Sequence, residues 1–236
     1  MDVPALVTLH VWGVPRAAVP RAVLRMATDR SGVRRIPGVR FAKLLGTGSG
    51  ETFGLRDADA RHWALLATWD TPAAAAHFEQ TGVVRRWDQL ADERWAARLV
   101  PLSSRGQWSG REPFGPVAAG RPVDDGAPVA ALTRARLVPS RAVSFWSSVP
   151  PVSAALHAAA GLRFALGVGE APIGLQGTFS VWDNAASLRS FAYRSQEHQR
   201  AIDDTARCGW YAEELFARFR VASAAGTYRG RDPLAA

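Results

Sequence analysis

The chain has 236 residues, of which 47% are hydrophobic and 21% are charged. This length and composition exclude a disordered or fibrous protein and allow one large domain or two small ones. No apolar run approaches the roughly 18 to 20 residues of a bilayer-spanning helix. The single cysteine, Cys208, excludes an intrachain disulfide and a cysteine-based zinc site. The first twenty residues lack the pattern of a secretory signal, so we expect a cytoplasmic protein.

The formal net charge is +8, and every basic residue except Lys43 is arginine. A basic chain often binds nucleic acid, but these arginines are scattered among Ala, Val and Pro, and no RNP-type aromatic motif accompanies them. We therefore expect no nucleic-acid partner. Because a guanidinium group binds carboxylates with two parallel N–H donors, the composition suits an acidic cofactor.

The chain contains an internal repeat. The matching segments are GVRFAKLLGTG with GLRFALGVGEA (38–48 with 161–171), LLATWDTPAAAAHF with TFSVWDNAASLRSF (65–78 with 178–191) and RGQWSG with AGTYRG (105–110 with 225–230). Residues 115–128 are rich in Gly, Pro and Asp, which is typical of a linker. The sequence therefore predicts a first unit over 1–114 and a second unit over 129–236.

The first copy has the pattern of a βαββαβ unit. Its strands are expected at 6–14, 39–45, 62–69 and 97–108. Pro20 opens a helix that runs to about residue 29. A second helix begins at Thr71 and Pro72, where Thr caps the helix and Pro takes the first turn.

The second copy is expected to repeat that order. Its strands are expected at 129–138, 163–168, 176–182 and 219–224. A helix is predicted over 151–160, stopped by Gly161, and a helical stretch over 187–217, broken near Arg194.

This order predicts an α+β fold of two tandem duplicated ferredoxin-like units. Each unit would form an antiparallel four-stranded sheet with helices on one face and a bare apolar face on the other. Burying the two bare faces against each other closes a barrel and keeps them from water. Two independent ferredoxin-like domains remain the alternative.

Glycines cluster after the second strand of each copy. They are Gly46, Gly48, Gly50 and Gly54 in the first copy and Gly167, Gly169 and Gly174 in the second. No Lys-Ser/Thr pair follows and no helix opens directly after them, so they do not fit a phosphate site. We expect a flexible connection between strands.

Five histidines are the candidate metal ligands: His10, His62, His77, His157 and His198. Their spacing does not favour a site with several protein ligands, but one histidine is enough for a haem iron. His198 is the first choice, because on the predicted helix it faces apolar ground beside small residues. A hydrogen bond to a loop carbonyl is the alternative for His198. His10, facing the barrel interior, is the second choice.

Aromatic residues of the second copy are the candidate wall of a ligand cavity. Phe164, Phe179, Trp182 and Phe191 lie on or beside the strands expected to line it. A flat apolar ligand and a purely aromatic core both fit this pattern. No Ser-His-Asp or Cys-His arrangement supports a hydrolase.

Several motifs together resemble the spheroidene monooxygenase family of carotenoid biosynthesis. They are FWSSVP, GVGEAP, TFSVWD, SQEHQRAI and WYAEELFARF in the second half and SRGQWSGREPF in the first. The resemblance implies a dimeric α/β barrel fold, a haem cofactor, and oxidation of a carotenoid to a keto product. Under it, His198 is implied as the proximal ligand of the iron, and Arg163, Arg134 and Arg136 are candidates for the haem propionates.

The expected function is thus that of a haem-dependent monooxygenase with an apolar substrate and an electron donor or peroxide as co-reactant. A smaller aromatic substrate, a cofactor-independent barrel monooxygenase, and a non-catalytic haem or small-ligand binding module remain open. Contact with a membrane surface and homo-oligomerisation also remain open as partner interactions.

Overall fold

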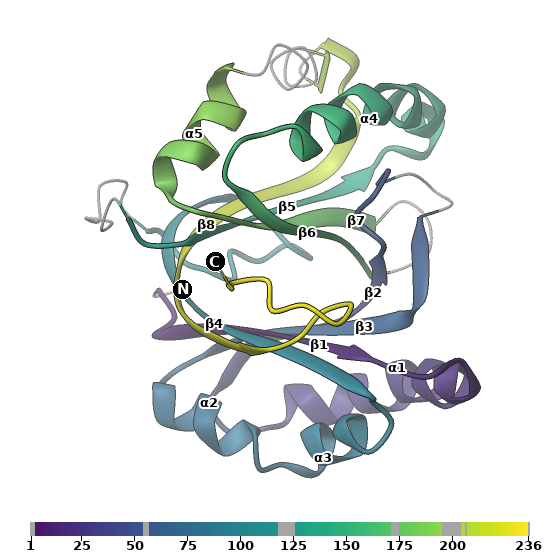
Figure 1. Cartoon of the computed structure of the whole chain (residues 1–236), viewed down its shortest axis with the longest axis vertical. Helices are drawn as coiled ribbons and strands as arrows, with labels where there is room; N and C mark the ends of the chain where they lie inside the picture. Colours follow the sequence, from purple (N-terminus) through teal and green to yellow (C-terminus); the bar gives the residue numbers. More distant parts are fainter. Residues whose placement is uncertain are drawn as a thin grey trace.

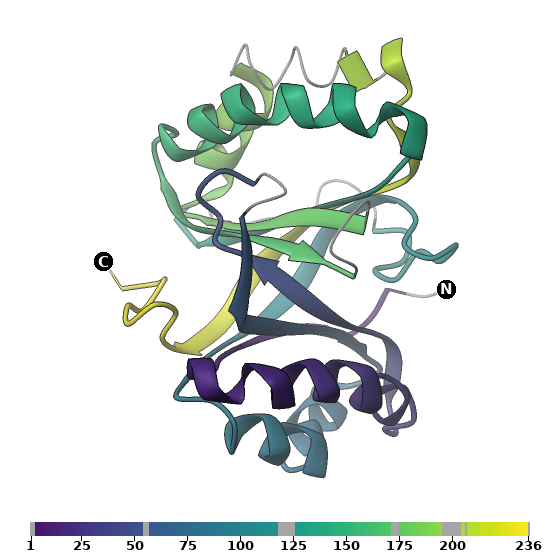
Figure 2. The same ribbon diagram turned by 90° about the vertical axis from the view of Figure 1, so that its right-hand side faces the viewer.

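The eight strands in the described part of the chain form one closed barrel, with helices on two opposite sides (Figure 1, Figure 2). The computed structural model describes residues 3–53, 57–117, 126–170, 175–194, 204–205 and 207–235. The α+β class expected from the sequence is confirmed. Within the described residues, no helix is long and apolar enough to cross a membrane.

The first half supplies four strands and three helices. The strands are β1 (Leu6–Gly13), β2 (Val39–Gly48), β3 (Ala58–Trp69) and β4 (Glu93–Gly106), and the helices are α1 (Val19–Arg34), α2 (Pro72–Phe78) and α3 (Gly82–Asp88). Proline stands in the first turn of both α1 and α2, where its missing N–H costs nothing. The Thr71 hydroxyl accepts the N–H of Ala74 at 3.1 Å, which confirms the predicted cap.

The second half, as far as it is described, supplies the other four strands and two α-helices. They are β5 (Val129–Leu137), β6 (Leu162–Gly169), β7 (Leu175–Trp182), β8 (Tyr211–Gly226), α4 (Ala142–His157) and α5 (Ala185–Arg194). Each half thus has the order βαββαβ, with α2 and α3 sharing the second helical position of the first half. The boundaries of the two units and their origin by duplication remain predictions.

Two predicted elements of the second half are wrong. Helix α4 begins at Ala142 rather than at residue 151, so Pro150 and Pro151 lie inside it. Proline is most common in the first helical turn, but here the helix begins about two turns before the prolines. Residues 211–217 belong to β8 rather than to a helix. Leu215 and Ala217, two positions apart, both point into the barrel core, as expected for a strand. In the sequence, this short segment fits both the helical period of 3.6 residues and the strand period of two.

The barrel is held by a core that both halves share. The strand order is β1–β3–β2–β6–β7–β5–β8–β4, and neighbouring strands are antiparallel. The aromatic members of the core are Phe41, Trp95, Trp108, Phe114, Phe164, Phe179, Phe219 and Tyr228. Because each large aromatic side chain buries roughly 150–250 Å², this shared core excludes two independent domains.

Two seams join the halves, and they differ in length. Strands β4 and β8 pair over eleven residue pairs, whereas β2 and β6 pair over three. At the short seam, Gly46 faces Gly169 and Gly48 faces Gly167. A Cβ atom on Gly167 would lie 3.2 Å from the Cα of Gly48, so glycine permits this close approach. The expected flexible connection is therefore wrong for these four glycines, which lie in strands.

The segments that follow β4 and β8 fold over opposite ends of the barrel in the same way. Trp108 and Tyr228 each donate a backbone hydrogen bond of 2.8 Å to the residue three positions later. Glu213 accepts the two N–H groups after Trp108, at 3.0 and 2.8 Å, and Glu93 accepts those after Tyr228, at 2.9 and 2.6 Å. Figure 1 shows the C-terminal segment lying across one opening.

His62 is buried beneath that C-terminal segment. Its ring packs 4.8 Å from the ring of Tyr228, and its two nitrogens lie 2.7 Å from Asp59 and 3.2 Å from Glu93. Burial opposes the charged imidazolium, but the two carboxylates outweigh it and raise the pKa of His62. The pair of carboxylates and the imidazolium thus fasten the C-terminal segment to the barrel.

We predict that His62→Gln destabilises the fold more near pH 6 than near pH 9. Protonated His62 stabilises the native state below its ordinary pKa, and that stabilisation is lost as pH rises through its raised native pKa. Urea unfolding of both proteins at the two pH values measures the difference. An equal loss at both values would contradict the prediction.

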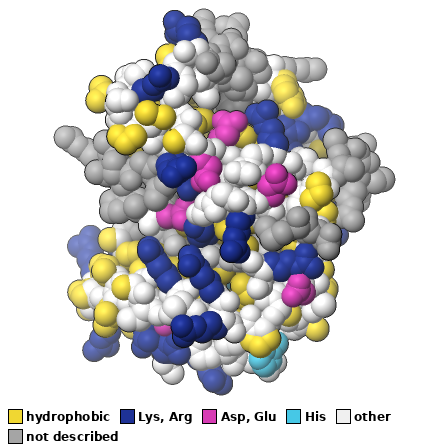
Figure 3. Space-filling view, turned by 180° about the vertical axis from the view of Figure 1, so that it is seen from behind, with side chains coloured by type: hydrophobic (Ala, Val, Ile, Leu, Met, Phe, Trp, Pro, Cys, Tyr) yellow, Lys and Arg dark blue, Asp and Glu magenta, His cyan; other side chains and the backbone are white. Residues whose placement is uncertain are grey.

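The surface charge of the protein is spread over its two layers. Figure 3 shows Lys and Arg side chains over both the upper and the lower part of one face, with acidic side chains among them. The scattered arginines of the sequence thus remain scattered on this face.

Candidate functional site

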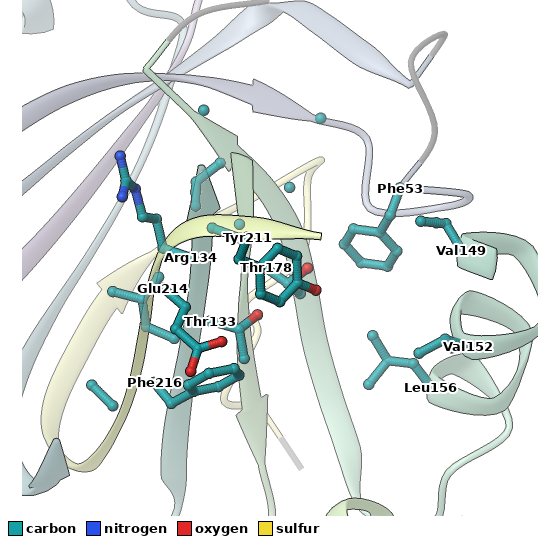
Figure 4. Close-up of a pocket in the computed structure, with 18 of the residues that line it drawn as sticks. Phe53, Thr133, Arg134, Val149, Val152, Leu156, Thr178, Tyr211, Glu214 and Phe216 are labelled. Carbon is teal, nitrogen blue, oxygen red and sulfur yellow. The ribbon is translucent and has the colours of Figure 1, made fainter. Parts of the chain in front are cut away.

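A cavity of about 1670 Å³ lies chiefly between the second-half sheet and the helices that cover it. Common small-molecule pockets have roughly 300–1,000 Å³. Figure 4 shows Val149, Val152 and Leu156 of α4 on one side of the cavity and Thr133 and Thr178 of the sheet on the other. The cavity continues over the short β2–β6 seam.

The strand register explains why a cavity is present in the layer between the second-half sheet and the helices α4 and α5. Leu6 pairs with Trp69 in the first half as Val129 pairs with Trp182 in the second, which fixes the correspondence of the two sheets. On this basis, Trp12, Leu44, Leu65 and His10 correspond to Ala135, Gly167, Thr178 and Thr133. Each exchange replaces a larger side chain with a smaller one on the face toward the helices. The second half therefore has a cavity where the first half has a core.

The matching layer of the first half is filled. Its largest side chains, Trp12, Trp69, Phe78 and Trp87, have no exposed surface. The cluster under α4 and α5 has only Val129, Leu156, Trp182 and Leu188 as buried hydrophobic members among the described residues. The first-half layer thus contributes packing that stabilises the fold, and the second-half layer leaves space for a ligand.

His10 belongs to the filled layer. It stacks on Trp12 at 5.4 Å and meets the edge of Phe78 at the same distance. The expectation that it faces the barrel interior is wrong, because its two neighbours in β1, Leu9 and Val11, occupy that side. Burial, with help from nearby arginines, lowers the pKa of His10 to about 3. His10 is therefore a neutral packing residue.

Several polar and charged side chains line the cavity, whose surface is mainly apolar. Tyr211 and Glu214 come from β8, and Figure 4 shows both beside Thr133 and Phe216. Burial raises the pKa of Tyr211, and the Glu214 carboxylate adds to the shift, so the phenol stays protonated as a donor. The indole N–H of Trp146 is buried and has no partner in the described part of the chain. These groups can bind polar atoms of an otherwise apolar ligand.

Five arginines line the cavity: Arg30, Arg105, Arg134, Arg189 and Arg218. Arg30 donates to the backbone carbonyl of Glu170 and Arg134 pairs with two carboxylates, which leaves Arg105, Arg189 and Arg218. The guanidinium of Arg105 lies 4.5 Å from the ring centre of Phe216, and Arg218 donates to the Tyr193 hydroxyl at 3.4 Å. No salt bridge to a carboxylate engages any of the three within the described residues. They remain available for an anionic group on a ligand.

Of the arginines singled out from the sequence, only Arg134 is among the residues that line the cavity. Arg134 points into a barrel end, where it pairs with Glu170 at 2.8 Å and with Glu213. Arg163 pairs with Asp183 at 2.5 Å. Arg163 and the exposed Arg136 are outside the cavity lining. Periodicity alone did not identify Arg105 and Arg218 as cavity residues. Arg105 lies in the predicted strand 97–108 and Arg218 between the predicted helical stretch and the predicted strand 219–224, and neither prediction gives the face on which the side chain lies.

The predicted aromatic residues fall into two groups. Phe164 and Phe179 lie in the barrel core against Trp95. Trp182 and Phe191 stack at 5.3 Å in the second-half layer. None of the four lines the cavity, whose aromatic members include Phe53, Phe145, Trp146 and Phe216.

His198 lies outside the described residues. Tyr193 and Thr205, described residues on either side of it in the sequence, both line the cavity. The other four histidines are described, and none of them lines it. No group of three or more His, Cys, Asp or Glu side chains that could hold a metal ion occurs among the described residues.

The barrel and its apolar cavity define a small-molecule-binding α+β barrel protein. A crystal structure of aldoxime dehydratase has this fold, with a TM-score of 0.59 at 13% identity, and the match covers 92% of this chain and 81% of that one. The crystal structure of an aldoxime dehydratase in complex with butyraldoxime gives a TM-score of 0.58 at 12% identity, covering 92% and 79%. At this level of identity the likeness shows the fold alone.

Sequence comparison with curated proteins identifies the family of this chain. A spheroidene monooxygenase of Rhodobacter capsulatus is 39% identical over 220 residues, which are 93% of this chain and 90% of that protein. The spheroidene monooxygenase of Rubrivivax gelatinosus is 40% identical over 195 residues, 83% and 73% of the two chains. That of Cereibacter sphaeroides is 35% identical over 212 residues, 89% and 64%. No protein-family model matches the chain.

The chain belongs to the spheroidene monooxygenase family. This confirms the resemblance that the sequence motifs indicated.

We predict that equivalent substitutions in the two layers differ in cost. Leu65→Ala removes a side chain with no exposed surface and should lower the free energy of unfolding by roughly 2–5 kcal/mol. Thr178→Ala, at the matching position beside the cavity, should cost less than about 1 kcal/mol. Urea unfolding measures both, and similar losses would show that the second layer is packed like the first.

We also predict that filling the cavity blocks binding. Thr178→Leu restores the leucine of the first half and should weaken binding of an anionic naphthalene dye about ten-fold. Thr28→Leu adds the same atoms to the exposed surface of α1 and serves as the matched control. Fluorescence titration measures both dissociation constants. Equal affinities in the two variants would place the dye outside the cavity.

Proposed function

We propose that this protein is a monooxygenase that oxidises a carotenoid in the second-half cavity. The observation that carries the proposal is the replacement of core side chains by small ones on one sheet only, which leaves a large apolar space. A carotenoid is a long apolar molecule that needs such a space. The name of the curated relatives supports the same substrate class.

We further propose haem as the cofactor in this cavity. The donor set supports the fit, since Arg105, Arg189 and Arg218 are suited to two propionates and the aromatic residues Phe145 and Trp146 of α4 to the flat macrocycle. His198 is proposed as the ligand of the iron, because the described residues Tyr193 and Thr205 that flank it line the cavity. When bound, haem would supply activation of dioxygen or peroxide.

The residues of the chain have separate proposed tasks. Val149, Val152 and Leu156 exclude water and hold the apolar substrate. The hydroxyl of Tyr211, which burial keeps protonated, donates a hydrogen bond to a polar atom of the substrate. The carboxylate of Glu214 is beside it and can hold a proton during turnover. With dioxygen, a reductant must supply two electrons, and the second oxygen atom leaves as water. With peroxide, which is already reduced by two electrons, no reductant is needed.

We also propose that the barrel arose by tandem duplication of one ferredoxin-like unit, as a single-chain form of a dimeric α/β barrel. The equal element order of the halves supports this origin. So do the matching turns at Trp108 and Tyr228, which share their hydrogen bonds and their carboxylate partners.

We predict a Soret band when the purified protein is reconstituted with haemin. His198→Ala should shift or abolish the band, because the iron would lose its proposed ligand. His77→Ala, on the exposed surface of α2, is the matched control and should keep it. Absorbance spectra of the three proteins give a readout that is independent of turnover.

Turnover of a carotenoid with reductant or peroxide then separates the remaining functions. Oxidised product together with the band supports the proposal. Product from the protein without haemin would replace it with a cofactor-independent monooxygenase. A band without product from any carotenoid would leave a haem-binding module, and the absence of a band in the wild type would overturn the haem proposal.

A further inference from the structure

Helix α1 carries a strongly basic surface. Residues 16–35, which comprise α1, the short turn before it and its C-cap, contain six arginines and one acidic residue, Asp29. Asp29 is buried and pairs with Arg86 of α3 at 2.8 Å. None of the six arginines is buried, and they are Arg16, Arg21, Arg25, Arg30, Arg34 and Arg35. The charge that this segment presents to solvent is therefore positive.

Most of these arginines have no acidic partner in the described part of the chain. Of the six, a salt bridge engages only Arg25, which lies 4.0 Å from Asp29. Arg30 donates a hydrogen bond of 3.3 Å to the backbone carbonyl of Glu170, which leaves its positive charge uncompensated. Several guanidinium groups on one helix attract anionic groups from solution.

Exposed apolar side chains stand among these arginines. The exposed fractions of Val23 and Leu24 are 53% and 63%. Four large hydrophobic side chains are exposed in the described part of the chain, and the other two, Val143 and Tyr193, lie on α4 and α5. Met26, on the sheet side of α1, is buried in the first-half layer. Val23 and Leu24 thus point away from that layer, where their contact with water is unfavourable.

Basic and apolar side chains share one side of the helix. Val23, Ala27, Arg30 and Arg34 are exposed and follow one another at intervals of four, three and four residues, which places them in one stripe. Leu24, three residues before Ala27, borders this stripe. We call these five residues the α1 face, and Figure 2 shows α1 along the side of the molecule toward the viewer. Aliphatic side chains flanked by arginines are typical of a helix that lies on a bilayer surface.

The α1 face also borders the cavity. Arg30 and its neighbour on the sheet side, Met26, are among the residues that line it. The carbonyl that accepts the Arg30 hydrogen bond belongs to Glu170, which directly follows β6 of the second half. A bilayer seated on α1 would therefore lie beside the cavity lining.

We propose that the α1 face docks the protein on a bilayer that contains anionic phospholipids. The charge is complementary, because the arginines meet the lipid phosphates. Val23 and Leu24 favour a bilayer over nucleic acid, since they can enter the boundary between headgroups and acyl chains. The inference goes beyond the proposed function, because it assigns a partner surface and does not depend on the substrate.

The test measures sedimentation of the full chain with two kinds of vesicle. One is made of phosphatidylcholine alone, and the other of equal parts phosphatidylcholine and phosphatidylglycerol. We expect the wild type to bind the anionic vesicles more tightly than the neutral ones. Arg30→Gln with Arg34→Gln should weaken binding to the anionic vesicles about ten-fold or more. Leu24→Gln keeps every charge and should weaken it about five-fold, through the lost apolar contact.

Each change on α1 has a matched control elsewhere on the surface. Arg111→Gln with Arg231→Gln removes the same net charge from two exposed side chains, and the backbone bonds of these residues remain. Val143→Gln removes an exposed aliphatic side chain from α4. Both controls should bind the anionic vesicles as tightly as the wild type. All the altered side chains are exposed or only half-buried, and circular dichroism checks that each variant is folded.

Three results would overturn the inference. The first is a wild type that does not bind the anionic vesicles, or binds the neutral ones equally. The second is an equal loss in the controls, because net charge or exposure in general, and not the α1 face, would then decide. The third is tighter binding to a DNA duplex that the arginine variant weakens and Leu24→Gln does not, which would assign the face to nucleic acid.

The vesicles contain no carotenoid, so this test is separate from that of the proposed function. Turnover of a carotenoid in detergent micelles tests the function without a bilayer. Vesicle binding without turnover would support the docking face and count against the proposed function, and turnover without vesicle binding would do the reverse.

Discussion

The burial of two apolar sheet faces against each other is the interaction on which the rest of this structure depends. Each βαββαβ half leaves one face of its sheet uncovered by its own helices, and water contact there would be costly. The eleven residue pairs of the β4–β8 seam and the common aromatic core bury the uncovered face of both halves. As a result, the helices lie on opposite outer sides, and neither helical layer is needed to close the barrel.

This division explains how one helical layer can be hollow. In a packed core, each large-to-small exchange such as leucine to alanine costs roughly 2–5 kcal/mol. The register places such exchanges together on the second sheet, with Leu65 matched by Thr178 and Leu44 by Gly167. The barrel core and the tryptophan-rich layer of the first half supply the packing that the second layer lacks. The side chains that stabilise the fold are therefore concentrated in the barrel core and the first-half layer, whereas the cavity lies in the second-half layer.

The sequence predicted the strands and the Thr71 cap well, because alternation and capping are local signals. It did not predict the faces on which side chains lie. Arg134 points into a barrel end and Arg218 toward the helices, and that difference depends on register, which no single segment specifies. The first part of strand β8, residues 211–217, was predicted as a helix because WYAEELFARF fits both the helical and the strand period. A signal for the cavity was present, because the repeat itself aligns Leu65 with Thr178 and Leu44 with Gly167.

Closure of the barrel also makes the cavity a property of both halves. The cavity is bounded by α4, α5 and the second-half sheet, and residues of the β2–β3 connection of the first half also line it. That connection reaches α4 because β2 and β6 approach closely, and they approach closely because glycines face each other across the seam. A side chain at Gly167 would meet the backbone of β2 at 3.2 Å and push the two halves apart. The same glycines therefore join the halves and bring Phe53 to α4, where its ring stacks on His157.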